Sequence, residues 1–343
     1  MTSEKGLQIV LAARPHGKVT PDDFRLEHFS LPEPGPGEFM IKVDYLSLDP
    51  YMRGRMDDRK SYAEPAKIGG VMPGESIGTI IASNHADFSQ GEVVLARTGW
   101  RTHAISTGEG VSRIERGTLP ITTRLGVLGM PGLTAYAGMK AIGKPRKGET
   151  VVVAAASGPV GSLVGQLAKI DGARAVGIAG GPMKCAYLKK ELNFDAAVDH
   201  RSPDFRSALA AACPNGIDVY FENVGGAVWQ AVLPLLNRFA RVPVCGLVAQ
   251  YDADPETQPA GQLAATMRQI LVQRILVRGF IVHDFANEYH ADFLRDVERW
   301  VSEGRIKYQE TIVDGLESAP RAFIGMLTGQ NFGKLLVRVD GKQ

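Results

Sequence analysis

The sequence has few cysteines and no strong excess of either charge. Its three cysteines, Cys185, Cys213 and Cys245, lie far apart along 343 residues. So small and scattered a set predicts no disulfide framework and a reducing compartment, which indicates the cytoplasm. The 39 basic and 37 acidic residues leave a net charge of +2, without long runs of one sign. This balance argues against nucleic acid or a membrane surface as the partner.

The sequence also lacks an uninterrupted apolar segment of membrane-spanning length. Residues 150–168 carry no charge, but Ser157, Gly158, Pro159 and Gly161 interrupt them. A strand, a turn and a helix explain this segment better than one spanning helix. The first residues are charged and polar, which does not match a secretory signal.

Metal ligands are scarce as well. Catalytic zinc needs three converging Cys, His or acidic ligands, and structural zinc needs about four. The sequence contains no C-x-x-C pair, its seven histidines are scattered, and Glu75 has no histidine beside it. We therefore expect no metal site.

One motif has the pattern of a nucleophilic serine, but we do not expect this serine to act as a nucleophile. Residues 74–78 match the G-x-S-x-G pattern of serine hydrolases, which works only where a strand turns sharply into a helix. Ser76 is instead followed by Ile77, Thr79, Ile80 and Ile81, which favour a continuing strand. A hydrolase reading would require ester cleavage that depends on Ser76.

Two domains are expected from the length of the chain. The first third contains short strands separated by Gly, Pro and Asn, which predicts an irregular β-barrel or folded sheet. These predicted strands are residues 7–12, 24–29, 39–46, 76–82 and 93–96. The pattern changes near Gly129, where longer helical segments begin.

From residue 130 onward, helix-like and strand-like segments alternate. The predicted helices are 133–142, 160–171, 183–192, 205–212, 228–236 and 263–273, and the predicted strands are 151–155, 174–179, 196–199, 218–221, 240–245 and 277–282. Such alternation predicts a parallel sheet with helices on both faces, and six strands match the doubly wound Rossmann fold. The fold class is therefore α/β, with a separate β-rich domain.

The end of the chain returns to strands. A long helix over 287–303 is followed by strands 308–312 and 335–339, which flank a helix at 319–327. We place this tail on the first domain. The predicted domains are thus 1–128 with 308–343, and 129–307.

A glycine-rich turn follows the first strand of the predicted parallel sheet. Residues 156–161 match the dinucleotide fingerprint, with alanine at its first glycine position. Gly158 would let the backbone approach a pyrophosphate, and Gly161 would let helix and strand pack closely. Pro159 suits the first helical turn, because its missing N–H has no intrahelical partner there. With Val160, these residues predict a phosphate site at a helix N-terminus, although a turn without ligand has the same pattern.

The second strand of this sheet distinguishes NADP from NAD. An NAD enzyme usually carries Asp or Glu there, to hold the ribose 2′-hydroxyl. Here the strand runs into Gly180-Gly181-Pro182-Met183-Lys184, so a cation follows and no acid does. This combination predicts NADP(H), with Lys184 on the 2′-phosphate. His200 and Arg201 are either part of the same pocket or surface residues.

Further candidate cofactor contacts follow the other strands, because ligands bind at the carboxyl ends of strands in such sheets. They are Asn223, Cys245 and Gly246, and the run Phe280, Ile281 and Val282. The alternative is that these are ordinary turns at strand ends.

Without a metal, hydride acceptance needs another electrophile. A carbonyl conjugated to an alkene suffices, since hydride adds at the β-carbon and negative charge develops on the carbonyl oxygen. A positioned O–H or N–H group should stabilise that enolate. Tyr251, after the fifth strand, is the first candidate, and Tyr51 in the other domain is the second. Either tyrosine could equally be a half-buried packing residue.

Several long motifs in order resemble one known family. They are LDPYMRG (48–54), GMPGLTAY (129–136), AASGPVG (155–161), ENVGG (222–226) and NFGK (331–334). Together they resemble the zinc-independent branch of the medium-chain dehydrogenase/reductase superfamily. That branch includes leukotriene B4 12-hydroxydehydrogenase, prostaglandin reductase and plant double-bond reductases. The similarity covers essentially the whole chain and extends in particular to the bacterial NADPH-dependent curcumin reductases.

The resemblance implies a GroES-like first domain, closed by the C-terminal tail, and an NADPH-dependent reductase of alkenals and enones. It implies that the residues proposed above line the cofactor, that Asn331 joins them, and that Tyr251 lies beside nicotinamide and substrate. Relatives often carry tyrosine in place of His200, and a histidine would make that contact more strongly when protonated. Homodimers are common in the family. Quinone reduction is the alternative activity, and NADPH binding without turnover is the alternative from another class.

Overall fold

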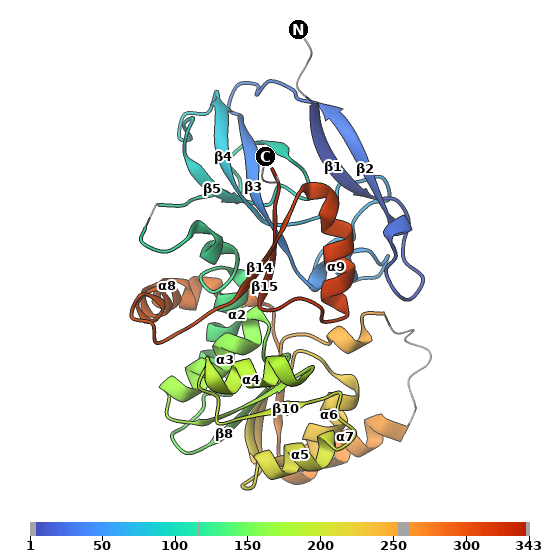
Figure 1. Cartoon of the computed structure of the whole chain (residues 1–343), viewed down its shortest axis with the longest axis vertical. Helices are drawn as coiled ribbons and strands as arrows, with labels where there is room; N and C mark the ends of the chain where they lie inside the picture. The colour runs from blue at the N-terminus through green and yellow to red at the C-terminus, as the bar shows by residue number, and fades with distance from the viewer. Residues whose placement is uncertain (1–4, 116, 253–260, 341–343) are drawn as a thin grey trace. The chain divides into compact units, whose positions relative to one another are not determined.

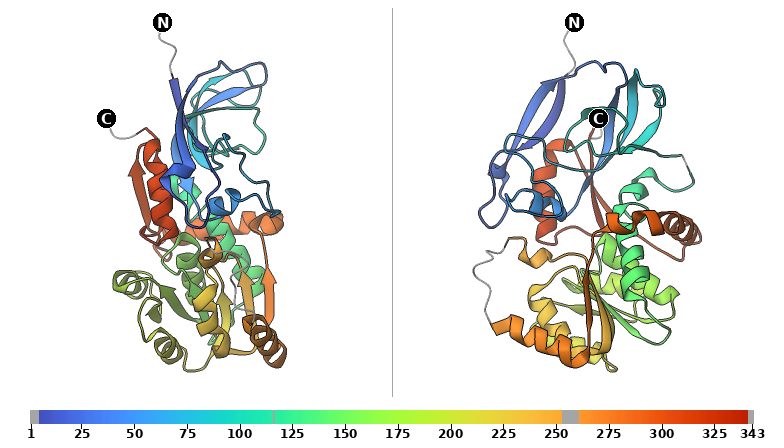
Figure 2. Two further views of the ribbon diagram at one scale, coloured as in Figure 1. Left: turned by 90° about the vertical axis from the view of Figure 1, so that its right-hand side faces the viewer. Right: turned by 180° about the vertical axis from the view of Figure 1, so that it is seen from behind.

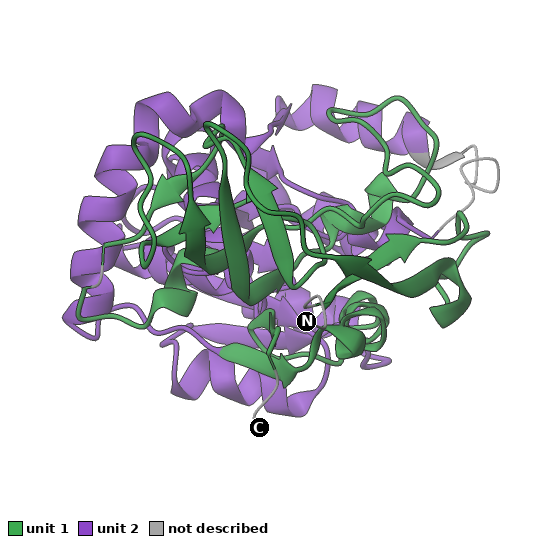
Figure 3. Cartoon of the chain, turned by 90° about the horizontal axis from the view of Figure 1, so that it is seen from above, with its two compact units in different colours: residues 1–125, 310–343 green, residues 126–309 purple. Residues whose placement is uncertain are grey.

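The computed structural model describes residues 5–115, 117–252 and 261–340. The chain divides into two compact units, Met1–Leu125 with Glu310–Gln343, and Gly126–Gln309 (Figure 3). No helix among the described residues is long and apolar enough to cross a membrane.

The first unit is built mainly from antiparallel strands. Its larger sheet has the order β14-β15-β3-β4-β5-β7, with β6 also paired to β3, and β1 and β2 form a separate pair (Figure 1). The elements are β1 Lys5–Leu11, β2 Phe24–Ser30, β3 Phe39–Leu48, α1 Tyr51–Arg55, β4 Ser76–Ser83, β5 Val93–Ala96, β6 His103–Ser106, β7 Ser112–Arg113, β14 Glu310–Asp314, α9 Ala319–Leu327 and β15 Lys334–Arg338.

The C-terminal tail lies in this first unit. Strand β15 pairs antiparallel with β3, from Leu335 opposite Leu48 to Arg338 opposite Tyr45. From α9, Phe323 packs into the core, with its ring centroid 5.6 Å from that of the fully buried Trp100. The apolar faces of β15 and α9 therefore complete a core that the N-terminal strands leave open.

The second unit is a six-stranded parallel sheet with the order β10-β9-β8-β11-β12-β13. Numbered within the sheet this is 3-2-1-4-5-6, the order of the doubly wound dinucleotide fold. Its elements are α2 Met130–Ala137, β8 Thr150–Ala154, α3 Pro159–Ile170, β9 Arg174–Ala179, α4 Pro182–Lys190, β10 Ala196–Asp199, α5 Phe205–Ala212, β11 Ile217–Phe221, α6 Gly226–Val232, β12 Leu236–Val244, α7 Gly261–Gln273, β13 Leu276–Gly279 and α8 Ala286–Ser302. The predicted α/β class is confirmed.

Helices cover both faces of the parallel sheet (Figure 2). One face packs against α5, α6 and α7 through a core that includes Val152, Leu209 and Val232, and the other carries α3 and α4. The central strand β8 is buried along its whole length, as an uninterrupted apolar run predicts for a parallel strand covered on both sides.

Several predicted boundaries were wrong. The predicted helix 228–236 ends at Val232, because Pro234 lacks the N–H that would continue it. Strand β12 starts at Leu236 instead of 240, since an irregularity around Phe239, which has φ of 65°, interrupts the β pattern. The first unit also contains α1, β6 and β7, which are too short to give a periodic signal.

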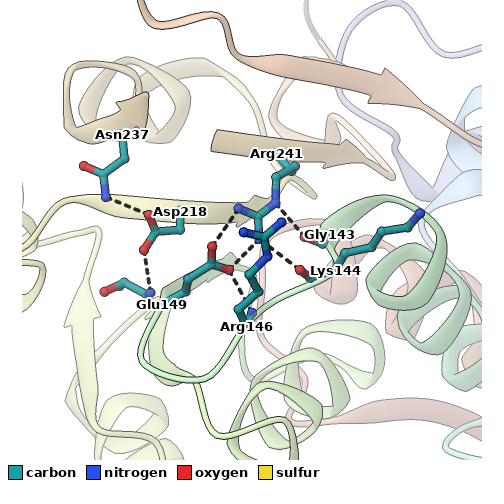
Figure 4. Close-up of polar contacts among 8 residues, drawn as sticks. Gly143, Lys144, Arg146, Glu149, Asp218, Asn237 and Arg241 are labelled. Carbon is teal, nitrogen blue, oxygen red and sulfur yellow. Dashed lines mark hydrogen bonds and ion pairs between the residues drawn. The ribbon is translucent and has the colours of Figure 1, made fainter. Parts of the chain in front are cut away.

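A polar cluster holds the amino ends of three parallel strands together (Figure 4). Arg241 donates from Nε to the carbonyl oxygen of Gly143 at 2.9 Å and pairs with Glu149, with Nη2 and Oε2 2.5 Å apart. The Asp218 carboxylate accepts from the backbone N–H of Thr150 at 2.9 Å and from Asn237 at 2.8 Å. These hydrogen bonds link the amino ends of the parallel strands. The predicted cofactor residues lie at the carboxyl ends of the strands.

Candidate cofactor and substrate site

The turn between β8 and α3 is the first part of the candidate site. Ala155 holds its sharp bend with φ of 50°, one residue before the position that the sequence pattern indicates. A Cβ atom on Gly161 would lie 2.5 Å from the carbonyl oxygen of Ala155 and 2.7 Å from Cα of Ala156. Only glycine therefore fits at 161, for the reason of close helix–strand packing that the sequence predicts.

The same turn suits an anionic group. Gly158 is the N-cap of α3 and Pro159 its first residue, followed by Val160. The first N–H groups of an α-helix have no intrahelical partner, and the helix dipole adds positive potential there. Among the residues that the structure describes, a Cβ on Gly158 would meet only the carbonyl oxygen of Ala155, at 3.3 Å, so the outer side of the turn is open to a ligand. This geometry fits a pyrophosphate.

Three basic side chains gather where β9 and β10 end. A Cβ atom on Gly180 would lie 2.9 Å from Nε of Arg201 and 3.0 Å from Nε2 of His200, so both side chains cover this glycine. Lys184 stands in the first turn of α4 and is half-buried. The structure thus brings together all three cations that the sequence singled out here.

The charges of this cluster work against one another. Desolvation, and then the positive charge of Arg201, lowers the pKa of Lys184. Desolvation, Arg201 and Lys184 also lower the pKa of His200, while Asp199 opposes them. A phosphate dianion would relieve this repulsion through charge-assisted hydrogen bonds, so the cluster fits a 2′-phosphate.

Asp199 is a residue of this region that the sequence reasoning missed. Its carboxylate accepts hydrogen bonds from the backbone N–H groups of Gly181 and Arg201, each at 2.9 Å. These two bonds lower the pKa of Asp199, led by the one from Gly181. Asp199 thereby fixes the conformation of the loop that carries the cations, because its carboxylate accepts hydrogen bonds from the backbone of that loop.

The end of β11 lies next to the end of β8. Asn223 donates from Nδ2 to the carbonyl oxygen of Ala154 at 2.8 Å, and its own carbonyl accepts from the N–H of Val248 at 3.2 Å. Asn223 therefore links two neighbouring strand ends to the segment that follows β12.

Glu222, beside it, is a buried hub that the sequence did not single out as a site residue. Its Oε1 accepts from Tyr220, and from the backbone N–H groups of Val224 and Gly225 at 2.7 and 2.8 Å. Its carbonyl accepts from Cys245 and Gly246. Burial raises the pKa of the Glu222 carboxyl, although the hydrogen bonds oppose this. In the sequence, a glutamate that follows a strand has the pattern of an ordinary turn residue. Only the structure shows that Glu222 joins the turn after β11 to the segment after β12.

After β12 the chain carries Cys245, Gly246 and then Tyr251. The Tyr251 oxygen lies 3.4 Å from the place that a Cβ on Gly246 would occupy, so this half-buried side chain turns back toward the end of the strand. Burial raises the pKa of the Cys245 thiol to about 12, with a smaller contribution from Glu222. Cys245 is therefore a neutral thiol and a packing group.

The run after β13 differs from its prediction. Strand β13 ends at Gly279, and Val282 begins a short 3-10 helix, whereas the predicted strand reached residue 282. The Phe280 ring is buried and stands edge-on to Phe221, with centroids 6.1 Å apart. Val282 is buried too, and Ile281 is partly exposed.

Two predicted site residues belong to the first unit. Tyr51 is the first residue of α1 and is partly buried, and Asn331 donates to the carbonyl oxygen of Gly333 at 2.8 Å.

Ser76 does not have the surroundings of a nucleophile. It lies in β4, is fully buried, and its Oγ is 2.7 Å from Oγ1 of Thr98. The predicted strand at this position is confirmed. Within residues 5–115, 117–252 and 261–340, no three His, Cys, Asp or Glu side chains gather as a metal-binding group.

Comparison with protein families gives two matches. Residues 7–114 match the N-terminal domain of oxidoreductase, and residues 159–299 match a family described as zinc-binding dehydrogenase.

Named relatives match over almost the whole chain. The chain is 50% identical over 333 residues to an NADPH-dependent curcumin reductase from Escherichia coli (strain K12), covering 97% of this chain and 96% of that protein. It is 39% identical over 326 residues to prostaglandin reductase 1 from Bos taurus, covering 94% and 95%. It is 37% identical over 340 residues to a 2-alkenal reductase (NADP(+)-dependent) from Nicotiana tabacum, covering 97% of each.

A solved structure agrees with these relatives. The crystal structure of CurA in complex with NADPH from Vibrio vulnificus superimposes with a TM-score of 0.94 at 49% identity, covering 98% of this chain and 100% of that one.

Proposed function

Because the chain belongs to the medium-chain dehydrogenase/reductase family, we infer that it is an NADPH-dependent reductase of the carbon–carbon double bond in α,β-unsaturated carbonyl compounds. The observation that carries this conclusion is the whole-length similarity to reductases of curcumin, prostaglandins and 2-alkenals. The glycine turn and the basic cluster on a 3-2-1-4-5-6 sheet support NADP(H) as the cofactor. The substrate class is alkenals and enones, including curcumin-like and prostaglandin-like compounds.

We propose that Gly158, Pro159, Val160 and Gly161 hold the pyrophosphate, and that Lys184 and His200 hold the 2′-phosphate. The remaining proposed cofactor contacts are Asn223, Cys245, Gly246, Tyr251, Phe280, Ile281, Val282 and Asn331. For Phe280 and Val282 the contact would come from the backbone, because both side chains are buried in the core.

The bound cofactor supplies a hydride for the β-carbon of the substrate. What the protein must add is orientation, exclusion of water and stabilisation of the enolate oxygen. We propose that the hydroxyl of Tyr251, with Tyr51 as the second candidate, donates a hydrogen bond to this oxygen. The α-carbon then takes a proton, which restores the carbonyl and leaves a saturated product.

The direct test is NADPH consumption by the purified protein against alkenals, enones, curcumin-like dienones and quinones. We expect oxidation of NADPH with the unsaturated carbonyl compounds and recovery of their saturated products. Turnover with quinones alone would instead assign quinone reduction. Binding of NADPH without oxidation across the whole panel would contradict a reductase.

Lys184→Ala tests the cofactor assignment. Loss of a charged hydrogen bond to a phosphate, worth about 1.5–3 kcal/mol, should raise the KM for NADPH roughly ten- to hundredfold. The KM for NADH, which lacks the 2′-phosphate, should barely change. Lys190→Ala, at the exposed end of the same helix, is the matched control. An unchanged ratio of the two KM values would show that Lys184 does not read the phosphate.

We also propose that two copies of the chain pair as a homodimer through the second unit. Strand β13 is the edge of the parallel sheet and is exposed along its length, with Leu276 50% exposed. On α7, Leu263, Met267 and Leu271 recur every four residues and are 69%, 56% and 76% exposed. An uncovered apolar edge of this kind favours pairing with another chain.

Leu271→Asp tests this pairing. By light scattering the wild-type protein should have twice the chain mass of 37.0 kDa, and Leu271→Asp should shift it toward the mass of a single chain. Leu26→Asp, at an isolated exposed leucine of β2, should leave the mass unchanged. A wild-type protein with the mass of one chain would refute the dimer.

Residues 1–128 with 308–343 are proposed as the substrate domain and 129–307 as the NADP(H) domain. A cytoplasmic location is also proposed, from the few and scattered cysteines.

A further inference from the structure

The turn after β11 holds the segment 245–251 through the carbonyl oxygens of three consecutive residues. Each of these carbonyls accepts a backbone N–H from that segment: Glu222 from Cys245 and Gly246 at 2.9 and 3.2 Å, Asn223 from Val248 at 3.2 Å, and Val224 from Ala249 at 3.0 Å. The segment also closes on itself, because the N–H of Tyr251 donates to the carbonyl oxygen of Val248 at 3.3 Å. Tyr251 is thus connected to Asn223 by two successive backbone hydrogen bonds.

The side chain of Glu222 holds this turn in shape. Its Oε1 accepts the backbone N–H groups of Val224 and Gly225 at 2.7 and 2.8 Å. The turn contains two adjacent glycines, Gly225 and Gly226, with φ of 75° and 56°. Glycine can adopt many backbone conformations, so the turn has little intrinsic preference for the one observed. The two hydrogen bonds to the Glu222 carboxyl therefore select this conformation.

Burial makes these two hydrogen bonds difficult to replace. Glu222 is 2% exposed, so bulk water does not reach the N–H groups through its side chain. Its Oε2 is buried and has no hydrogen-bond partner within the described part of the chain. The bonds to the turn use Oε1, so the oxygen of an amide in the same place would accept the same N–H groups.

The same turn borders the side chain of Tyr251. The hydroxyl oxygen of Tyr251 and the carbonyl oxygen of Asn223 lie 3.4 and 3.5 Å from the position that a Cβ on Gly246 would take. A Cβ on Gly225 would lie 3.4 Å from Nε2 of Gln250, the residue before Tyr251. The turn and the segment 245–251 therefore pack directly against each other, and a change in the turn would move the Tyr251 hydroxyl.

We propose that Glu222 is a positioning residue for enone reduction, which holds the Tyr251 hydroxyl at the distance and direction that the enolate oxygen requires. The inference rests on the proposed function and deepens it, because Tyr251 is the donor proposed there. Glu222 exchanges no atom with the substrate and takes no part in the transfer of hydride or proton. It contributes orientation, and a misplacement of about 1 Å can lower a rate by about a hundredfold.

The test is a double-mutant cycle on kcat for an enone at saturating NADPH, with Glu222→Met and Tyr251→Phe. Methionine has a similar length but no oxygen, so the N–H groups of the turn lose their acceptor. Glu222→Met should lower kcat about ten- to hundredfold in the wild-type background. The loss should be less than about threefold in the Tyr251→Phe background, where no hydroxyl remains to be misplaced. Equal losses in the two backgrounds would overturn the inference but leave the reductase intact.

Two further variants separate positioning from a general loss of stability. Glu222→Gln keeps an acceptor oxygen for the turn but buries amide N–H groups, so it should lower the Tm and keep kcat within about threefold. Tyr220→Phe removes the third hydrogen bond of the same Oε1, which is 2.9 Å long, and leaves the turn intact. It should also lower the Tm and keep kcat. A kcat that falls in step with Tm across the three variants would show a merely structural role. A wild type that oxidises no NADPH across the substrate panel would instead refute the proposed function.

Hydrogen exchange gives a readout that needs no turnover. In Glu222→Met, the backbone amides of residues 245–251 should exchange faster than in wild type, whereas those of β8 should exchange at the wild-type rate. The Kd for adenosine 2′,5′-bisphosphate, which carries phosphates but no nicotinamide, should stay close to the wild-type value. Unchanged exchange over 245–251 would overturn the inference. Equal acceleration over 245–251 and β8 would also overturn it, because the whole unit would then have loosened.

Discussion

Tyr251→Phe is expected to lower kcat for an enone by about 10²–10³, because removing one donor to an oxyanion costs about 2.7–4 kcal/mol of transition-state stabilisation. The structure supports this role through the direction of the side chain, whose oxygen lies over Gly246 at the carboxyl end of β12. The ring stays in the variant, so the Kd for NADPH measured by fluorescence titration should barely change.

The matched control is Tyr289→Phe, on α8 of the same unit, where the ring packs near Phe285 and Tyr136. This variant should keep both kcat and the Kd for NADPH. If Tyr251→Phe turns over as fast as wild type, Tyr251 is not the enolate donor, and Tyr51 becomes the first candidate. A loss of NADPH binding equal to the loss of kcat would instead make Tyr251 a cofactor contact.

Lys334→Met should destabilise the first unit by about 3–5 kcal/mol, the usual cost of leaving one partner of a buried ion pair without the other. Lys334 is 3% exposed, and its loss would leave the Asp49 carboxylate buried with Ser47 as its donor. The measurement is the midpoint of urea-induced unfolding of the whole chain, followed by far-ultraviolet circular dichroism.

Lys42→Met makes the same substitution in the same sheet. Lys42 pairs with Asp340, but their side chains are 41% and 52% exposed. Water screens such a pair, so the expected cost is below about 1 kcal/mol. Adding Asp49→Asn to Lys334→Met should recover part of the lost stability, because it removes the stranded charge. Equal losses in Lys334→Met and Lys42→Met would refute a special role for the buried pair.

Local pattern located most elements of the second unit. Strands β9 and β10 and helix α5 have the predicted bounds, and the order of the sheet is that of the doubly wound dinucleotide fold, which the six predicted strands matched. The reason is that the apolar residues of each element have a recognisable local pattern, either a short continuous run in a buried strand or a repeat at helical spacing. The pattern failed where tertiary contacts override it. Buried Phe280 and Val282 look like a strand in sequence but lie beyond the end of β13.

The residues of the candidate site also fall into two groups, those that local sequence pattern predicts and those that only tertiary contacts reveal. The sequence alone determined the glycine turn, the missing acid after the second strand and the cation at Lys184. Each of these features lies within a short continuous segment of the chain, so its pattern can be recognised without the fold. Only the tertiary structure showed the contacts of Asp199, Glu222 and Lys334. Lys334 and Asp49 are far apart in the chain, and the carbonyl of Glu222 joins the end of β11 to the segment after β12, so these contacts exist only once the sheets have formed.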